Sequence, residues 1–330
     1  MTGRLNHRLC TAPMMDWSDR HCRYFFRQLA PHAVVYTEMV TTGALIHGDV
    51  ERHLAFDSAE HPVALQLGGS EPPELAHCAR LGEDRGYDEV NLNCGCPSER
   101  VQKGAFGACL MAEPQLVAKC VKAMQDAVSI PVTVKHRLGI DSIESYDFVR
   151  RFVETLATAD CATFLVHARN AMLKGLSPKY NRERPPLKHD YVYRLKREFP
   201  ELEIVVNGGI TSAAQVPEQL MHVDGVMLGR AAYYDPYLLA QLERALFAAP
   251  RAASRAEIVA AMRKYAERQV ASGVALRAIA RHMLGLYHGQ PRARLWRQRL
   301  SDPNGLAANR AWLLEDAMRE VEAAALAEPA

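Results

Sequence analysis

Eight short apolar runs recur along this 330-residue chain, and amphipathic segments separate them. The runs cover residues 9–12, 34–37, 63–67, 89–92, 132–135, 163–166, 204–206 and 225–228. The segments between them include residues 18–29, 72–85, 114–128, 145–159, 191–199 and 213–221, which carry apolar residues at helical spacing. Strands that alternate with helices favour βαβ units and a parallel sheet. Eight such units predict a closed (β/α)8 TIM barrel rather than an open sheet.

Nearly every predicted strand is followed by polar, charged or glycine residues. In chain order, the residues at these ends are Pro13 with Met14 and Met15, Glu38, Gln66, Asn93, Lys135, His167, Asn207 with Gly208 and Gly209, and Gly229 with Arg230. Parallel strands are buried on both faces, so polar groups gathered at one end need a ligand or each other as partners. In a barrel these ends meet at one mouth, where the active site forms.

Two glycine-containing motifs follow the seventh and eighth predicted strands. Asn207, Gly208 and Gly209 come after the seventh, and Gly229 and Arg230 come after the eighth. Glycine lets backbone N–H groups approach an anion closely, and an arginine adds a charge-assisted contact. Because these two loops are the usual phosphate site of such barrels, the pair predicts a phosphorylated cofactor or substrate at the mouth.

Lys135 and His167 end neighbouring strands beside this predicted phosphate site. A cation there can stabilise the negative charge that develops on a flavin ring when it is reduced. Gln66 can form a hydrogen bond to the same ring system, and the backbone of Pro13 to Met15 can lie against it.

A thiol in a polar loop follows the fourth predicted strand, in the sequence Asn93-Cys94-Gly95-Cys96-Pro97. Cys96 precedes a proline at the mouth, where its acidity can be tuned, so it is a candidate acid or nucleophile. The other cysteines fall mostly in apolar or helical contexts, which is typical of buried structural thiols. The chain has no Cys-x2-Cys or His-x3-His pair to serve as a second set of ligands, so no metal site is predicted.

Composition bounds the cellular setting and the partner. Eight cysteines without an export signal predict reduced thiols and a cytoplasmic protein, and no apolar run is long enough for a membrane helix. Residues 251–330 hold thirteen Arg or Lys and eight Asp or Glu, a net +5, which leaves −3 for residues 1–250. A basic tail on a slightly acidic body suggests a polyanionic partner, although on composition alone a solvated helix face is the more common explanation of such charge.

These motifs together resemble the flavin-dependent tRNA-dihydrouridine synthases, and in particular the bacterial A type. The likeness is carried by residues 13–16, 66–69, 91–97, 135–137, 167–169, 207–209 and 229–230, with residues 174–179 and 281–289 typical of the A type. The resemblance implies an FMN-binding TIM barrel over residues 1–245. It also implies an all-helical tRNA-binding domain over residues 246–330.

Residue roles carry over motif by motif, with Cys96 as the catalytic residue. Those expected to hold FMN are Pro13, Met14, Met15, Gln66, Lys135, His167, Asn207, Gly208, Gly209, Gly229 and Arg230. Those expected to contact tRNA are Asn93, Lys179, Arg182, Arg294 and Arg297.

The same resemblance implies the reaction and the partners. NADPH, or NADH, reduces FMN, hydride passes from flavin N5 to uracil C6, and Cys96 gives a proton to C5. The product is 5,6-dihydrouridine in the D-loop of tRNA, at positions 20 and 20a for the A type. The enzyme is expected to be a monomer without a structural metal.

Two other functions stay open at this level. An FMN barrel enzyme that acts on a free pyrimidine would have the same flavin-binding and phosphate-binding motifs. It needs neither a basic helical extension nor Lys179 and Arg182, because its substrate is small. A tRNA-binding protein without catalysis is opposed by the intact set of Cys96, Lys135 and His167.

Overall fold

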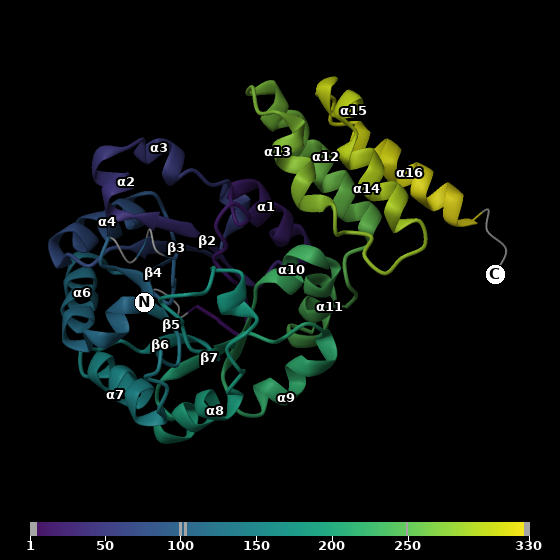
Figure 1. The fold of residues 1–330 in the computed structure, drawn as a ribbon. Coiled ribbons are helices and arrows are strands. Elements are labelled where there is room, and N and C mark those ends of the chain that lie inside the picture. The colour runs from purple at the N-terminus through teal and green to yellow at the C-terminus, as the bar shows by residue number, and fades with distance from the viewer. Residues whose placement is uncertain (1–4, 99–100, 102–103, 249, 327–330) are drawn as a thin grey trace. The chain divides into compact units, whose positions relative to one another are not determined.

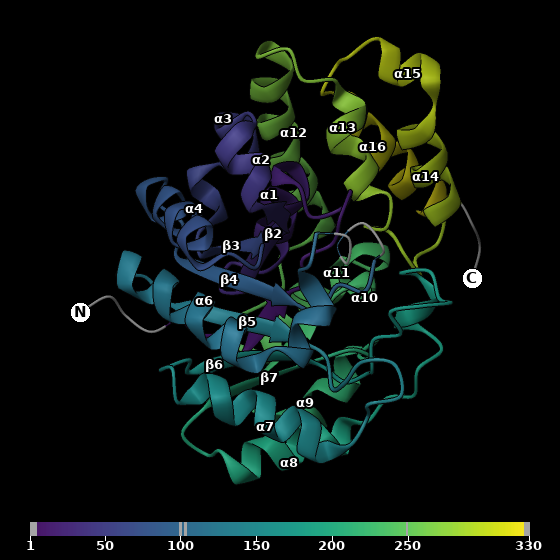
Figure 2. The same cartoon turned by 60° about the vertical axis from the view of Figure 1, so that its left-hand side comes forward.

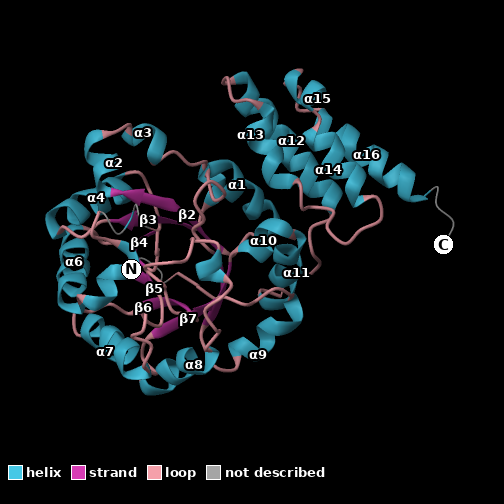
Figure 3. Cartoon of the chain, in the orientation of Figure 1, coloured by secondary structure: helices cyan, strands magenta, loops and turns pink. Residues whose placement is uncertain are grey.

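Eight parallel strands close into a barrel in the computed structural model, which describes residues 5–98, 101, 104–248 and 250–326. Each strand pairs with its sequence neighbours, and β1 pairs with β8 to close the ring. The strands are β1 (Leu9–Thr11), β2 (Val34–Thr41), β3 (Val63–Gly68), β4 (Glu89–Cys94), β5 (Val132–His136), β6 (Thr163–His167), β7 (Glu203–Asn207) and β8 (Gly225–Leu228). Figure 1 and Figure 3 show the strands as an inner ring with helices around it. The predicted TIM barrel is confirmed.

The helices of the barrel unit follow the predicted segments closely. They are α4 (Pro72–Asp84), α6 (Pro114–Ala127), α7 (Tyr146–Ala157), α8 (His189–Glu198) and α9 (Val216–Leu220), with the 3-10 turns η1 (Ser58–Glu60), η2 (Gly107–Ala112), η3 (Tyr180–Arg182) and η4 (Ala213–Gln215). Two short helices after β2 were not predicted, namely α2 (Thr42–His47) and α3 (Val50–His53). Each is too short for a periodic signal, and each begins at a side-chain cap, from Thr41 and Asp49 respectively.

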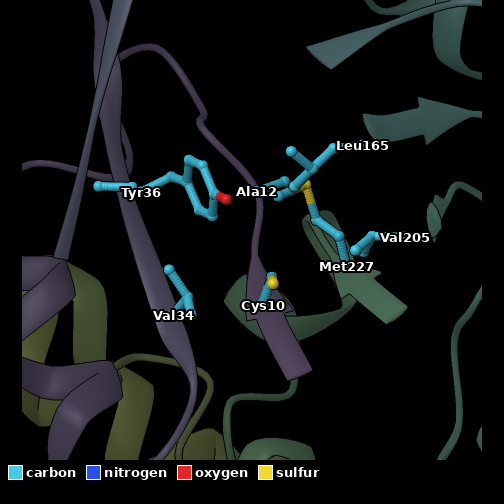
Figure 4. Close-up of a cluster of buried hydrophobic side chains, with 8 residues drawn as sticks. Cys10, Ala12, Val34, Tyr36, Leu165, Val205 and Met227 are labelled. Atoms are coloured by element: carbon cyan, nitrogen blue, oxygen red, sulfur yellow. The ribbon is translucent and has the colours of Figure 1, made fainter. Parts of the chain in front are cut away.

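The barrel interior has an apolar side. A buried cluster joins residues from β1, β2, β3, β6, β7 and β8 (Figure 4). Met14 packs against this cluster. Its members are Cys10, Ala12, Val34, Tyr36, Ala64, Leu165, Val205 and Met227. Packing of this kind fills the centre of an eight-stranded barrel with side chains and leaves the chemistry to its rim.

The interior beside β4 is polar instead. Successive side chains of a strand point to opposite faces, so Glu89, Asn91 and Asn93 share one face of β4. The hydrogen-bond partners of this face lie on the neighbouring strands, where Gln66 stands opposite Asn91 on one side and Thr133 stands opposite it on the other. All of these polar side chains are buried. Burial of so many polar groups is tolerable because they satisfy one another.

A buried ion pair lies at the amino ends of the strands. His7 Nε2 lies 2.6 Å from Glu89 Oε2, and His7 Nδ1 lies 3.1 Å from Glu203 Oε2. Burial alone would lower the pKa of His7, but the two carboxylates outweigh it and raise the pKa to about 10. Glu89 Oε1 also accepts hydrogen bonds from the hydroxyls of Tyr36, over 2.7 Å, and Thr133, over 2.6 Å. The carboxylate thus joins three strands to the segment before β1.

A second compact unit contains the remaining helices. It comprises residues 17–33 and 230–330, and the barrel unit comprises residues 1–16 and 34–229. Its elements are α1 (Arg20–Leu29), α10 (Arg230–Tyr234), α11 (Tyr237–Leu246), α12 (Arg255–Ala271), α13 (Leu276–Ala280), η5 (Arg281–Met283), α14 (Ala293–Ser301), α15 (Pro303–Ala307) and α16 (Leu313–Leu326). Figure 2 shows α12, α13, α14 and α16 gathered together. In this grouping α1, α10 and α11 belong with the later helices. The expected division into functional domains at residue 245 stays a prediction.

Buried polar contacts organise this helical unit. Trp296 is fully buried, and its indole N–H donates to the carbonyl of Met283 over 2.8 Å. Asp19 caps α1 by accepting the backbone N–H of His21, and its other oxygen pairs with Arg281 over 2.6 Å.

Within the described residues, no helix combines the length and the apolar character that a membrane crossing requires.

We expect His7→Leu to lower the free energy of unfolding by about 3–5 kcal/mol, because it leaves buried carboxylates without their cation. The folded-state pKa of His7, about 10, lies above the ordinary value of 6.5. Its stabilisation is therefore complete below pH 6.5 and is lost as the pH rises toward 10. Urea unfolding of both proteins at pH 6 and pH 9 measures this difference.

Lys122→Ala is the matched control, since Lys122 forms an exposed pair with Asp126. It should leave the free energy of unfolding nearly unchanged at both values of pH. A destabilisation by His7→Leu that does not shrink between pH 6 and pH 9 would contradict the assigned role of the imidazolium.

Candidate active site at the carboxyl ends of the strands

The structure brings several predicted site residues into two hydrogen-bonded groups at the barrel mouth. Asn93 Nδ2 donates to Gln66 Oε1 over 2.8 Å, which joins the ends of β3 and β4. Lys135 Nζ donates to Asn207 Oδ1 over 3.1 Å, which links β5 to β7 across β6. Asn207 Nδ2 donates in turn to the carbonyl of Met227 on β8. Two sets of hydrogen-bonded polar side chains therefore line the mouth.

The cysteine loop is anchored by Asn93. Its Oδ1 accepts the backbone N–H groups of Gly95 and Cys96, each over 3.0 Å. This is the turn geometry that asparagine side chains favour. Cys96 is partly exposed and its thiol lies 3.6 Å from the hydroxyl of Ser98, whereas Cys94 is fully buried. Of the two thiols in this loop, Cys96 is therefore the more accessible one.

Gly107 supports the same loop from the far side. The N–H of Ala108 donates to the carbonyl of Cys96 over 2.9 Å. Gly107 has φ +79°, and a Cβ there would lie 2.6 Å from the same carbonyl oxygen. Both the backbone conformation and the close approach therefore require glycine at this position.

The amine of Lys135 lies in a poorly solvated position. Burial and, to a smaller extent, the Arg137 guanidinium lower its pKa to about 7, against a raising contribution from Cys96. Burial, with Arg137 and Lys135 as neighbouring cations, also holds the pKa of His167 well below its usual value. His167 is therefore a neutral imidazole near neutral pH, while Lys135 is poised between its two forms.

Glycines make the cradle that an anionic group needs. Gly208 has φ +103°, and a Cβ there would lie 2.6 Å from the His167 ring. Gly209 has φ +80°, and a Cβ there would lie 2.4 Å from Leu187. Gly229 differs, because a Cβ would meet only ordinary contacts with Ala12 and Met14. Packing within the barrel therefore does not require glycine at this position, which leaves room for a backbone approach to a ligand.

Arg137 is a site residue to which sequence reasoning gave no role. Its Nε donates to the carbonyl of Gly95 over 3.2 Å, and its Nη1 donates to the carbonyls of Asn170 and Asn181. The guanidinium is buried, which lowers its pKa to about 9. It ties the cysteine loop to the segment that contains Lys179 and Arg182. The only signal in the sequence was the tract 135–137 itself.

Other predicted residues stand apart from these groups. Pro13 and Met14 are half-buried after β1, while Met15 is 55% exposed. Lys179 and Arg182 are exposed, at the start and the end of η3.

The remaining predicted residues belong to the helical unit. Arg230 begins α10, directly after Gly229, and Arg294 and Arg297 are exposed on α14. Their roles toward FMN and tRNA stay predictions. Within the described part of the chain, no cluster of three or more His, Cys, Asp or Glu side chains could hold a metal ion.

Comparisons with known proteins agree with one another. The family model described as dihydrouridine synthase matches residues 10–322. A Synechocystis protein named tRNA-dihydrouridine(20/20a) synthase is 56% identical over 312 residues, covering 94% of this chain and 93% of that protein. A protein of the same name from Pseudomonas syringae pv. tomato is 57% identical over 319 residues, covering 96% and 95%. One from Salmonella typhi is 55% identical over 315 residues, covering 95% of each.

We expect Lys135→Met to stabilise the protein without ligand by roughly 1–3 kcal/mol below pH 7, allowing for solvent screening at this half-buried site. The folded-state pKa of about 7 lies below the ordinary 10.5, so the buried charge is fully unfavourable below pH 7. As the pH rises from 7 to 10.5 the folded protein releases this proton first, and the gain should disappear.

Urea unfolding at pH 6 and pH 9 measures the gain. Lys119→Met, at an exposed lysine of α6, is the matched control and should show no dependence on pH. An equal gain for Lys135→Met at both values of pH would show that the Lys135 amine is not desolvated.

Proposed function

The chain belongs to the dihydrouridine synthase family, and on that premise we propose that it reduces uridines 20 and 20a of tRNA to 5,6-dihydrouridine. One structural observation carries the proposal. Asn93 holds the Cys96 loop at a barrel mouth where the neighbouring strand β5 carries Lys135 and a glycine cradle follows β7. A proton donor thus shares the mouth with groups suited to an anionic cofactor.

The donor set fits FMN. Gly208 and Gly209 have positive φ, and Gly229 has room where a side chain would be. Such glycines let backbone N–H groups approach the FMN phosphate closely. Lys135 and His167 offer a cation and a neutral imidazole to the polar edge of the ring system. The other predicted binding residues are Pro13, Met14, Met15, Gln66, Asn207 and Arg230. When bound and reduced by NADPH or NADH, FMN supplies the hydride that reaches uracil C6.

Cys96 completes the reduction of the double bond. Addition of hydride at C6 leaves negative charge delocalised onto the uracil C4 carbonyl, and C5 then needs a proton. The Cys96 thiol supplies that proton, and Asn93 fixes the backbone from which the thiol extends. General acid catalysis of this kind contributes about 10²–10⁴-fold to the rate. No second hydride is needed, because one hydride at C6 and one proton at C5 together saturate the C5–C6 bond.

Recognition of tRNA draws on basic residues of both units. Lys179 and Arg182 are exposed at η3, and Arg294 and Arg297 are exposed on α14. Turning a uridine out of its RNA context costs a few kcal/mol, which phosphate contacts can offset. We further propose that the enzyme works as a cytoplasmic monomer without a metal.

We expect Cys96→Ala to retain flavin and to oxidise NADPH, but to form dihydrouridine about 10²–10⁴-fold more slowly. Cys109→Ala is the matched control, because Cys109 is also partly exposed and its thiol points to the carbonyl of Phe106. Mass spectrometry of tRNA nucleosides measures the product, and absorbance at 340 nm follows NADPH. Product formation at the normal rate in Cys96→Ala would remove the thiol from the mechanism. Equal reduction of free uridine would point instead to an enzyme of free pyrimidines.

We expect Lys179→Ala with Arg182→Ala, and separately Arg294→Ala with Arg297→Ala, to weaken tRNA binding. For every phosphate that a removed side chain had neutralised, the slope of log affinity against log salt should fall by about one unit. Arg319→Ala is the control, since Arg319 pairs with Glu315 and Asp316 on the same helix. Filter binding at several salt concentrations gives the slopes. A pair whose slope equals that of the wild type lies outside the interface.

A further inference from the structure

A row of hydrogen-bonded side chains runs through the barrel from its amino end toward the mouth. The row begins at Glu89, where the Thr133 hydroxyl donates to Oε1 over 2.6 Å. Asn91 Nδ2 then donates to Thr133 Oγ1 over 2.8 Å. All three side chains are at most 1% exposed, so water does not compete for these bonds.

The row continues up to the cysteine loop. Gln66 Nε2 donates to Asn91 Oδ1 over 2.8 Å, and Asn93 Nδ2 donates to Gln66 Oε1 over 2.8 Å. Asn93 Oδ1 finally accepts the N–H groups of Gly95 and Cys96. Four side chains therefore connect the buried Glu89 carboxylate to the backbone of the proposed proton donor.

The direction of every bond in this row follows from its first member. A carboxylate only accepts hydrogen bonds, so Glu89 takes the single hydroxyl proton of Thr133. Thr133 Oγ1 must then accept from its other neighbour, which makes Asn91 present its NH2 group there and its oxygen to Gln66. Gln66 therefore donates to Asn91 and presents its own oxygen to Asn93. Asn93 then donates to Gln66, and its oxygen faces the loop.

We propose that Thr133 and Asn91 are positioning residues for Cys96, through a hydrogen-bond direction that Glu89 sets. The inference rests on the proposed function, in which the Cys96 thiol is the proton donor. A reversed row would turn the NH2 group of Asn93 toward the loop N–H groups, so that donors would face donors. Without a fixed direction, the loop has no acceptor to hold it.

Three substitutions separate this role from simple stabilisation. Thr133→Val keeps the shape of the side chain but removes the hydroxyl, and Thr133→Ser restores it. Tyr36→Phe is the matched control, because the Tyr36 hydroxyl donates to the same Glu89 Oε1 over 2.7 Å but lies outside the row. If the row only stabilises the core, Thr133→Val and Tyr36→Phe should behave alike.

The first measurement is the rate at which iodoacetamide alkylates Cys96 in the full-length protein without tRNA. Mass spectrometry of the Cys96 peptide follows the reaction. We expect several-fold faster alkylation in Thr133→Val, because the loop is freed, and wild-type rates in Thr133→Ser and Tyr36→Phe. Equal rates in Thr133→Val and Tyr36→Phe would overturn the proposal.

The second measurement is dihydrouridine formation by the same proteins loaded with FMN. Thr133→Val should lower kcat about 10²-fold, as expected when a reacting group is misplaced by about 1 Å, with little change in KM for tRNA. A rise in KM alone, with kcat intact, would contradict the positioning role. If the wild type forms no dihydrouridine, the proposed function fails, while the alkylation rates still decide whether the row holds the loop.

Asn91→Ala provides a second variant in case Thr133→Val does not fold. It interrupts the row one step nearer the loop and should also speed alkylation of Cys96 several-fold. An unchanged rate in folded Asn91→Ala would count against the proposal as strongly as the Thr133 result.

Discussion

The barrel depends on one carboxylate that is buried at its amino end. Glu89 is fully buried and lies against His7, Tyr36 and Thr133, which come from the segment before β1 and from two strands. A buried charge is unfavourable unless it is paired and its oxygens are hydrogen-bonded, and both conditions are met here. Because Glu89 only accepts hydrogen bonds, it also dictates how the polar groups above it are oriented. The stability of the amino end of the barrel and the orientation of the polar side chains toward its mouth therefore depend on the same carboxylate, that of Glu89.

The two sides of the barrel interior contribute differently, one by hydrophobic burial and the other by oriented hydrogen bonds. The cluster around Leu165 and Met227 is apolar and contributes burial without direction. The side chains around Asn91 are polar and contribute direction, because each hydrogen bond has a donor and an acceptor. A site built above the polar side inherits fixed orientations from below, which preorganises it before a ligand binds.

The sequence was sufficient to predict all eight strands, since buried parallel strands appear as compact apolar runs. The site residues at the strand ends followed from the same pattern. The inward row of β4 was missed because Val90 and Leu92 made that strand look uniformly apolar, although the alternation of Glu89, Asn91 and Asn93 was visible. Arg137 was missed for a different reason. Its partners are carbonyls up to 44 residues away, and no local pattern predicts where a backbone carbonyl will lie.

The contacts of Arg137 bear on how this family of barrels can change. Loops at the mouth of a TIM barrel are commonly treated as separate modules that can be exchanged one at a time. Here one guanidinium donates to Gly95, Asn170 and Asn181, so the loops after β4, β5 and β6 are joined through it. Exchange of the loop after β4 or after β6 alone would disturb the carbonyls that accept from this buried cation, and exchange of the loop after β5 would remove the cation itself. In engineering and in evolution, these three loops are therefore expected to change together.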